Sequence, residues 1–144
     1  MRKPWLYLSA WFEKHRSQYY HYLFEVSAAG EWTQWILFFL QGVKEQAQDA
    51  NLRLKQLLTL QSDWRKRVTQ ARSSALLLEI VDMLFEMPIC TIPQVSERLQ
   101  VGYPSAKNAV QRLVQSGILS PLGELNYGKV FVASDIMNIL RSTA

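Results

Sequence analysis

The chain has 144 residues, of which 49% are hydrophobic and 19% charged, so it is not a disordered sequence and can bury an ordinary core. Its longest strongly apolar run, 35–40, is far shorter than the roughly 20 residues of a membrane-spanning helix, and no signal-peptide pattern opens the chain, so we expect a cytoplasmic protein without membrane contact. The net charge of +4 comes from residues 1–73, because residues 74–144 hold five Lys or Arg and six Asp or Glu.

The first half is aromatic and its periodicity is helical. A helix is predicted over Ser9–Val26, with Gly30 as its stop, and a second helix from Glu31 to about residue 70. The second helix carries an apolar stripe at three- and four-residue spacing: Trp32, Trp35, Ile36, Phe39, Leu40, Val43, Ala47, Leu54, Leu57 and Leu58. Its far end has a basic cluster that we interpret as a solvated surface rather than a phosphate site: Arg65, Lys66, Arg67 and Arg72.

These helices are too apolar to cover one another, since Leu37, Phe38 and Phe39 are adjacent and one stripe cannot bury all of them. Two explanations stand. Two copies pack together, which predicts a homodimer through residues 5–43, or the chain is the tail of a longer protein whose earlier helices are absent.

The second half begins with a short helix over Ala75–Glu86, capped by Ser73 or Ser74 and stopped before Pro88. The apolar residues of this helix that we expect to be buried are Leu76, Leu77, Ile80, Leu84 and Phe85. The boundary between the halves is therefore expected at residues 70–74, which gives a helical segment over 1–73 and a second domain over 74–144.

Two short helices joined by a tight turn follow. Thr91 is a good N-cap, Pro93 suits the first turn, and Val95 and Leu99 fall on one face of the first helix. Gly102 is expected to break this helix. The second helix opens at Pro104 and ends at Gly117, with apolar positions at helical spacing: Ala106, Ala109, Val110 and Leu113.

Two strands complete the pattern. Ile118–Leu122 and Lys129–Val132 are predicted to form a hairpin around a Gly123–Gly128 loop that carries Asn126 and Tyr127. A helix-turn-helix followed by such a hairpin is a winged helix-turn-helix. The predicted fold is therefore mainly α: a helical bundle segment followed by a winged helix-turn-helix domain with a small β-hairpin wing.

The outward positions of the second short helix suit nucleic acid. Lys107 and Arg112 are expected to neutralise phosphates, and Asn108 and Gln111 to bind an adenine edge at two points. The predicted DNA-binding residues are Tyr103, Ser105, Lys107, Asn108, Gln111, Arg112, Asn126 and Lys129. The same residues also fit a solvated surface, because winged helices serve for protein docking and dimerisation too and the local charge is modest.

Residues for catalysis or metal binding are few. Cys90, the single cysteine, has no Cys or His at metal-ligand spacing, so we expect it to pack in the core. His15 and His21 lie six residues apart and do not share the face on which two imidazoles bind one metal. The Asp and Glu residues make no close pair for acid–base chemistry. We predict no enzymatic activity, no cofactor and no metal site.

Several motifs of the first half occur together in one known family. They are LYLS, the Tyr-Tyr pair after a charged helix and the Trp-x-x-Trp-Ile-x-Phe-Phe run, all within Leu6–Ala47, followed by ARSSALLLEIVDMLF and the winged pattern. Nearly the whole chain thus resembles the C-terminal part of Fic-family proteins, downstream of their catalytic core.

The family transfers AMP from ATP to protein hydroxyls through an HPFxDGNGRxxR motif and an acidic metal ligand. Neither histidine here is followed by Gly-Asn-Gly, and all six glycines are isolated. The resemblance therefore implies a non-catalytic fragment. Two hypotheses follow: a tail that binds double-stranded DNA and serves regulation, or an interaction module that dimerises or positions target proteins for a catalytic core outside this chain.

Overall fold

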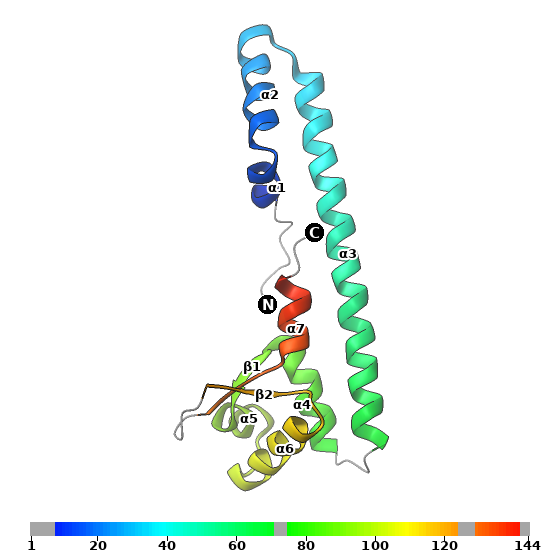
Figure 1. Cartoon of the computed structure of the whole chain (residues 1–144), viewed down its shortest axis with the longest axis vertical. Coiled ribbons are helices and arrows are strands. Elements are labelled where there is room, and N and C mark those ends of the chain that lie inside the picture. The colour runs from blue at the N-terminus through cyan, green and yellow to red at the C-terminus, as the bar shows by residue number, and fades with distance from the viewer. Residues whose placement is uncertain (1–7, 71–74, 124–128, 142–144) are drawn as a thin grey trace. The chain divides into compact units, whose positions relative to one another are not determined.

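A computed structural model describes residues 8–70, 75–123 and 129–141 (Figure 1). Within these ranges the protein is mainly helical, with seven helices and a small three-stranded antiparallel sheet. The contacts divide the chain into two compact units, residues 1–54 and 55–144. This division lies earlier than the boundary at 70–74 that the sequence predicts, because the end of the long helix belongs to the core of the C-terminal unit.

The N-terminal unit contains α1 (Leu8–Lys14), α2 (Arg16–Ala29) and the first part of α3 (Trp32–Gln70). The single helix predicted over Ser9–Val26 is wrong, because the backbone at His15 leaves the helical region, with φ −109° and ψ 31°. The Nδ1–H of His15 lies 2.9 Å from the carbonyl of Trp11, which also accepts the His15 backbone N–H. Gly30, in the left-handed conformation at φ 72°, ends α2 as predicted.

Trp11 anchors α1 to α3 and is buried. Its ring centroid lies 4.7 Å from that of Phe38, and its Nε1–H donates a 2.6 Å hydrogen bond to Glu45 Oε2. Gly42 lies between these two residues, where a Cβ atom would be only 2.7 Å from the indole ring. The face of α3 that receives α1 is therefore the one that carries Phe38, Gly42 and Glu45, at helical spacing.

Most of the apolar stripe that the sequence predicts lies on a face of α3 other than the one that receives α1. Trp32, Ile36, Leu40 and Leu54 are each about half exposed, and Phe39 is 38% exposed. Trp35 is half-buried beside Phe12 and Tyr19. The sequence therefore identified an apolar stripe, but the part of it in the N-terminal unit is left largely uncovered by the described residues.

The C-terminal unit packs the end of α3 against α4 (Ala75–Glu86). Trp64 and Val68 of α3 are buried in one core with Leu77, Ile80 and Leu84 of α4, as the sequence predicts for the α4 residues. Leu76 and Phe85 are half-buried at the edge of that core. The predicted Ser73 or Ser74 cap lies outside the described residues.

Two short helices follow, α5 (Ile92–Leu99) and α6 (Tyr103–Gln115). Thr91 is the predicted N-cap of α5 and forms a capping box, in which its backbone N–H donates to Gln94 Oε1 at 2.9 Å and its Oγ1 accepts from the Gln94 N–H. α5 ends before Gly102, as predicted, but Gly102 does not make the turn. The turn is made by Gln100, in the left-handed conformation at φ 53°, and Gly102 instead precedes α6 as its N-cap.

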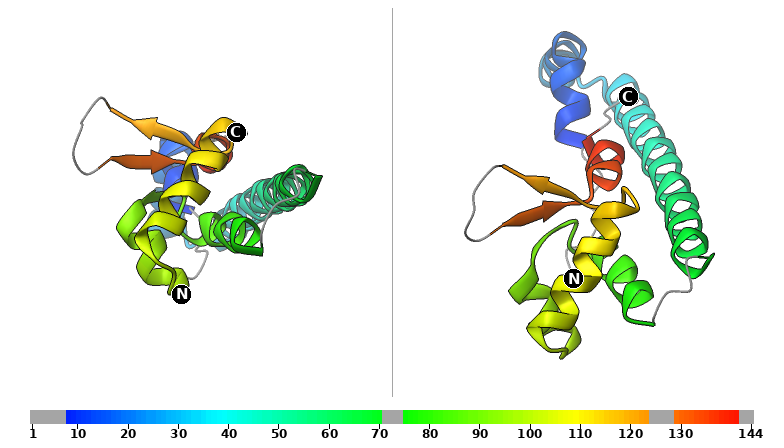
Figure 2. Two further views of the ribbon diagram at one scale, coloured as in Figure 1. Left: turned by 90° about the horizontal axis from the view of Figure 1, so that it is seen from below. Right: turned by 60° about the horizontal axis from the view of Figure 1, so that its bottom comes forward.

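The sheet has the order β1-β3-β2, formed by β1 (Ile89–Thr91), β2 (Ser120–Leu122) and β3 (Val130–Val132). Pro121 opposes Phe131 in the β2–β3 pair, and Cys90 opposes Phe131 in the β1–β3 pair. Figure 2 shows β2 and β3 as an antiparallel hairpin that extends beyond the helices of this unit. The strands predicted over 118–122 and 129–132 are confirmed in shortened form, since Ile118 and Leu119 are buried in the core before β2 begins.

β1 and the last helix, α7 (Ser134–Arg141), were not predicted. α7 contributes Ile136 to the core. In the part of the chain that the structure describes, no helix has the length and hydrophobicity needed to cross a membrane.

Candidate nucleic-acid interface

α6 presents one face to the core and the other to solvent. The predicted apolar positions Ala106, Ala109, Val110 and Leu113 are all buried. The remaining side chains point outward, and they include two cations, Lys107 and Arg112, and no carboxylate. The α6 surface is therefore basic although the residues 74–144 together are slightly acidic.

A groove of about 1170 Å³ runs between α6, the start of α5 and the β2–β3 hairpin. Its described lining residues are Thr91, Ile92, Pro93, Tyr103, Lys107, Gln111, Val114, Gln115, Pro121, Lys129 and Phe131. Lys107 comes from α6 and Lys129 from the residue before β3, so each comes from a different element. None of these described lining residues carries a carboxylate. Lys107 and Lys129 supply two ammonium groups, and most of the other lining residues are apolar.

The structure brings together half of the predicted DNA-binding residues. Tyr103, Lys107 and Gln111 follow one another at i, i+4 on the groove side of α6, and Lys129 joins them from the hairpin. Ser105, Asn108 and Arg112 are exposed on α6 but do not line the groove. Asn126 lies outside the described residues.

The sequence reasoning missed several lining residues. Gln115 continues the i, i+4 series of Tyr103, Lys107 and Gln111, so helical spacing alone was enough to find it. Thr91 lines the groove from β1, which pairs with β3 beside Phe131. A three-residue strand gave no alternation from which that pairing could be deduced.

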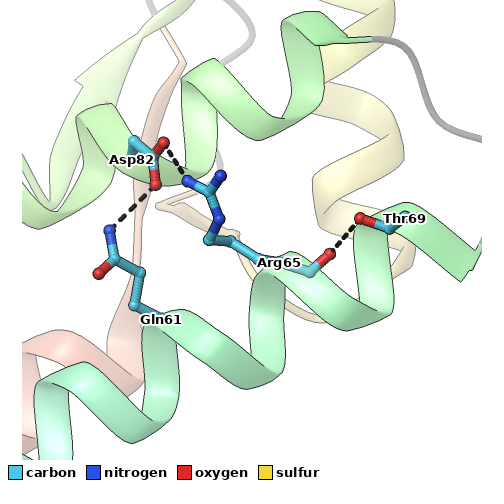
Figure 3. Close-up of polar contacts among 4 residues, drawn as sticks. All are labelled: Gln61, Arg65, Thr69 and Asp82. Carbon is cyan, nitrogen blue, oxygen red and sulfur yellow. Dashed lines mark hydrogen bonds and ion pairs between the residues drawn. The ribbon is translucent and has the colours of Figure 1, made fainter.

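The basic cluster at the end of α3 has structural partners. Arg65 forms an ion pair with Asp82 of α4, and Gln61 donates a 3.0 Å hydrogen bond to the same carboxylate (Figure 3). The hydrogen bond from Arg65 to Asp82 raises the pKa of the Arg65 guanidinium, and the negative charge of Asp82 raises it further. Arg67 donates a 3.2 Å hydrogen bond to the carbonyl of Ser116, the C-cap of α6.

Both arginines remain exposed, as predicted, while they hold α3 to the rest of its unit. Arg72 lies outside the described residues. Arg98 is paired with Glu86 at 2.6 Å. By contrast, neither Lys107 nor Lys129 forms an ion pair with any residue in the described ranges.

Cys90 is buried in the core, as predicted, and burial raises the pKa of its thiol to about 11. A thiol in that state is a poor nucleophile. His15 stacks on Trp11 with a centroid distance of 4.3 Å, and His21 lies 5.5 Å from the Tyr22 ring. Over residues 8–70, 75–123 and 129–141, no group of three His, Cys, Asp or Glu is placed to hold a metal ion.

The chain matches no protein-family model. The resemblance to Fic-family proteins therefore stays a prediction from the residue pattern of Leu6–Ala47.

Proposed function

We propose that the C-terminal unit is a winged helix-turn-helix that binds double-stranded DNA, with α5 and α6 as the helix-turn-helix and the β2–β3 hairpin as the wing. The observation that supports this most is the groove between α6 and the hairpin. Its two cations, Lys107 and Lys129, have no carboxylate among the described lining residues, and this arrangement suits a polyanion at neutral pH.

In this proposal α6 enters the major groove, where helices of this size fit. Lys107 and Lys129 contact phosphates on the two sides of the docked helix, and Gln111 reaches a base edge. Asn108 and Arg112, on the outer part of the same helix, extend the contact to a neighbouring base and phosphate. The phosphate contacts position the helix, and the amides read the sequence.

The expected affinity for random DNA is low. Each neutralised phosphate contributes a slope of about −0.9 to the dependence of log K on log salt concentration, so two or three cations give a slope of only about −2 to −3. Binding without sequence preference then falls at the weak end of the usual range, with Kd of roughly 10⁻⁴–10⁻⁶ M. Tight binding requires a preferred sequence or a second copy.

We further propose that the chain is the non-catalytic C-terminal part of a Fic-like protein, on the resemblance carried by Leu6–Ala47. In such a protein the DNA-binding unit serves gene control or self-regulation. The second candidate function is a protein-interaction module, and the exposed apolar face of α3 is the observation that favours it.

The proposal is tested by fluorescence anisotropy with a labelled random duplex between low and moderate salt. The test variant is Lys107→Glu with Lys129→Glu. The matched control is Lys55→Glu with Lys66→Glu, which makes the same change of charge at exposed positions of α3 in the same unit, outside the groove.

We expect the groove variant to lose at least about ten-fold in affinity and its salt slope to become shallower by about 2, one phosphate per lysine. The control keeps a slope close to that of the unaltered protein. An unaltered protein that fails to bind at low salt, or a groove variant whose salt slope is unchanged, contradicts DNA binding through this groove.

A further inference from the structure

One face of α3 in the N-terminal unit is apolar, continuous and largely exposed, although Phe12 of α1 lies beside one of its members, Phe39. We call it the α3 stripe: Trp32, Ile36, Phe39, Val43, Ala47, Ala50 and Leu54, with Leu40 beside it. At 100° per residue these positions fall within one face about 100° wide, and none of them is polar or charged. The face that receives Trp11, with Phe38 and Gly42, is a different one.

The α3 stripe is large enough to matter. Its Trp, Phe, Ile and Leu members are between 38% and 58% exposed, whereas Val43 and Ala47 are half-buried. With accessible areas of roughly 180–250 Å² for free side chains of this size, each chain leaves roughly 500–600 Å² of stripe in water. A pair of such surfaces therefore buries roughly 1,000–1,200 Å², which reaches the roughly 1,000 Å² expected of a specific interface.

The spacing along the α3 stripe is symmetric about Val43. The positions advance by 4, 3 and 4 residues from Trp32 to Val43, and by 4, 3 and 4 again from Val43 to Leu54. Each half is one 11-residue repeat, and 11 residues in three turns is close to the natural period of an α-helix. Two such helices can therefore keep their stripes in contact over six turns without pronounced supercoiling.

The sizes of the side chains are also complementary under that symmetry. In an antiparallel pair of α3 helices crossing at Val43, Phe39 of each copy faces Ala47 of the other, and Ile36 faces Ala50. Trp32 then faces Leu54. A parallel pair instead sets Phe39 against Phe39 and Ala47 against Ala47, which overfills one level and leaves a gap at the next.

We propose that the α3 stripe binds a second copy of this chain, antiparallel, with the two-fold axis at Val43. The area, the absence of charge and the large-to-small pairing across the axis each support this occupant. The interface differs from a dimer through residues 5–43, because it extends to Leu54 and is built from α3, with α1 touching it only where Phe12 lies beside Phe39. It does not depend on DNA binding.

The first test is the molar mass of the 144-residue chain by sedimentation equilibrium across the micromolar range. We expect about twice the chain mass of 16.7 kDa, and at least a ten-fold weaker self-association for Ile36→Glu and for Leu40→Glu. The matched control is Leu37→Glu, since Leu37 is 56% exposed on the same helix but lies off the stripe. Circular dichroism checks that each variant is folded.

The second test examines the antiparallel register in which the two α3 helices pair. Ala47→Phe sets one Phe against another at two symmetric levels and weakens the dimer, whereas Phe39→Ala with Ala47→Phe exchanges the two sides and restores it to within a few-fold. A chain that stays monomeric at the highest concentration overturns the proposal and leaves the stripe to a different protein. A dimer that survives Ile36→Glu and Leu40→Glu, or a double variant that stays dissociated, overturns the α3 interface or its antiparallel register.

Discussion

Trp64 tests whether the end of α3 is part of the C-terminal core. Its side chain is fully buried, with its ring centroid 5.5 Å from that of Phe85, although the sequence groups it with the N-terminal half. Replacing a buried aromatic residue by Ala typically costs about 3–5 kcal/mol through lost burial and the cavity left behind. Because a domain of this size is stable by about 5–15 kcal/mol, Trp64→Ala removes a large part of the stability of this unit.

Trp64→Phe is expected to behave differently. The indole Nε1–H of Trp64 is buried without a hydrogen-bond acceptor among the described residues. An unsatisfied buried donor costs about 1–3 kcal/mol, and Phe removes it while it keeps most of the ring. The loss of ring area and the relief of the N–H therefore oppose each other, and we expect Trp64→Phe to change the free energy of unfolding by no more than about 1.5 kcal/mol.

Hydrogen exchange followed by mass spectrometry measures the change in the free energy of unfolding of the C-terminal unit alone, through peptides of α4 and α6. Leu58→Ala is the control, since Leu58 is 56% exposed on the same helix and its loss should cost no more than about 0.5 kcal/mol. A change below about 1 kcal/mol for Trp64→Ala refutes the assignment of residues 55–70 to this core. Equal losses for Phe and Ala refute the argument from the unsatisfied N–H.

Four further results are expected. Gly42→Ala should push the Trp11 indole off α3 and raise hydrogen exchange in α1, because its Cβ would lie 2.7 Å from the ring; unchanged exchange contradicts this contact. The hydrogen bond from Trp11, and after it the one from Gln41, lowers the pKa of Glu45 from its ordinary value of 4.5. The ionised Glu45 carboxylate therefore stabilises the fold above the ordinary pKa, and this stabilisation is lost as the pH falls through the lowered pKa. Trp11→Phe should raise the Glu45 pKa in an NMR titration, and an unmoved pKa shows that the bond is not the cause. Thr91→Ala should destabilise the C-terminal unit by about 1 kcal/mol in urea unfolding, with Thr59→Ala, on the exposed surface of α3, as a neutral comparison. Cys90 should react with iodoacetamide at pH 8 only as fast as the unit opens, since its pKa is about 11; rapid labelling of the folded protein contradicts its burial.

The parts of the fold that follow from local chemistry could be predicted. Helix signals at Gly30, Thr91, Pro93 and Pro104 act on their own neighbours, so α3 to α6 were found close to their bounds. The break at His15 was not predictable in this way, since no Gly or Pro marks it. Gly102 is the residue from which the sequence predicts the end of α5, yet Gln100 makes the left-handed turn there.

Contacts between distant residues explain the remaining differences. Periodicity found the apolar stripe of α3 but could not say that Phe38 and Gly42, rather than Ile36 and Leu40, receive α1. The candidate site was half predicted for the same reason. Helical spacing gave Tyr103, Lys107 and Gln111, and the predicted hairpin gave Lys129. The contribution of β1 depends on a strand pairing between residues about 40 apart in sequence.

Pro121 has a consequence for the solubility of the hairpin. β2 pairs on one side with β3, and its middle residue, Pro121, has no N–H to donate. In an antiparallel pair the neighbours Ser120 and Leu122 direct their N–H groups toward β3, so the outer edge of these three residues offers no donor at all. A strand from another molecule therefore finds no N–H donor along the outer edge of β2, so β-sheet extension at these three residues is disfavoured by one proline.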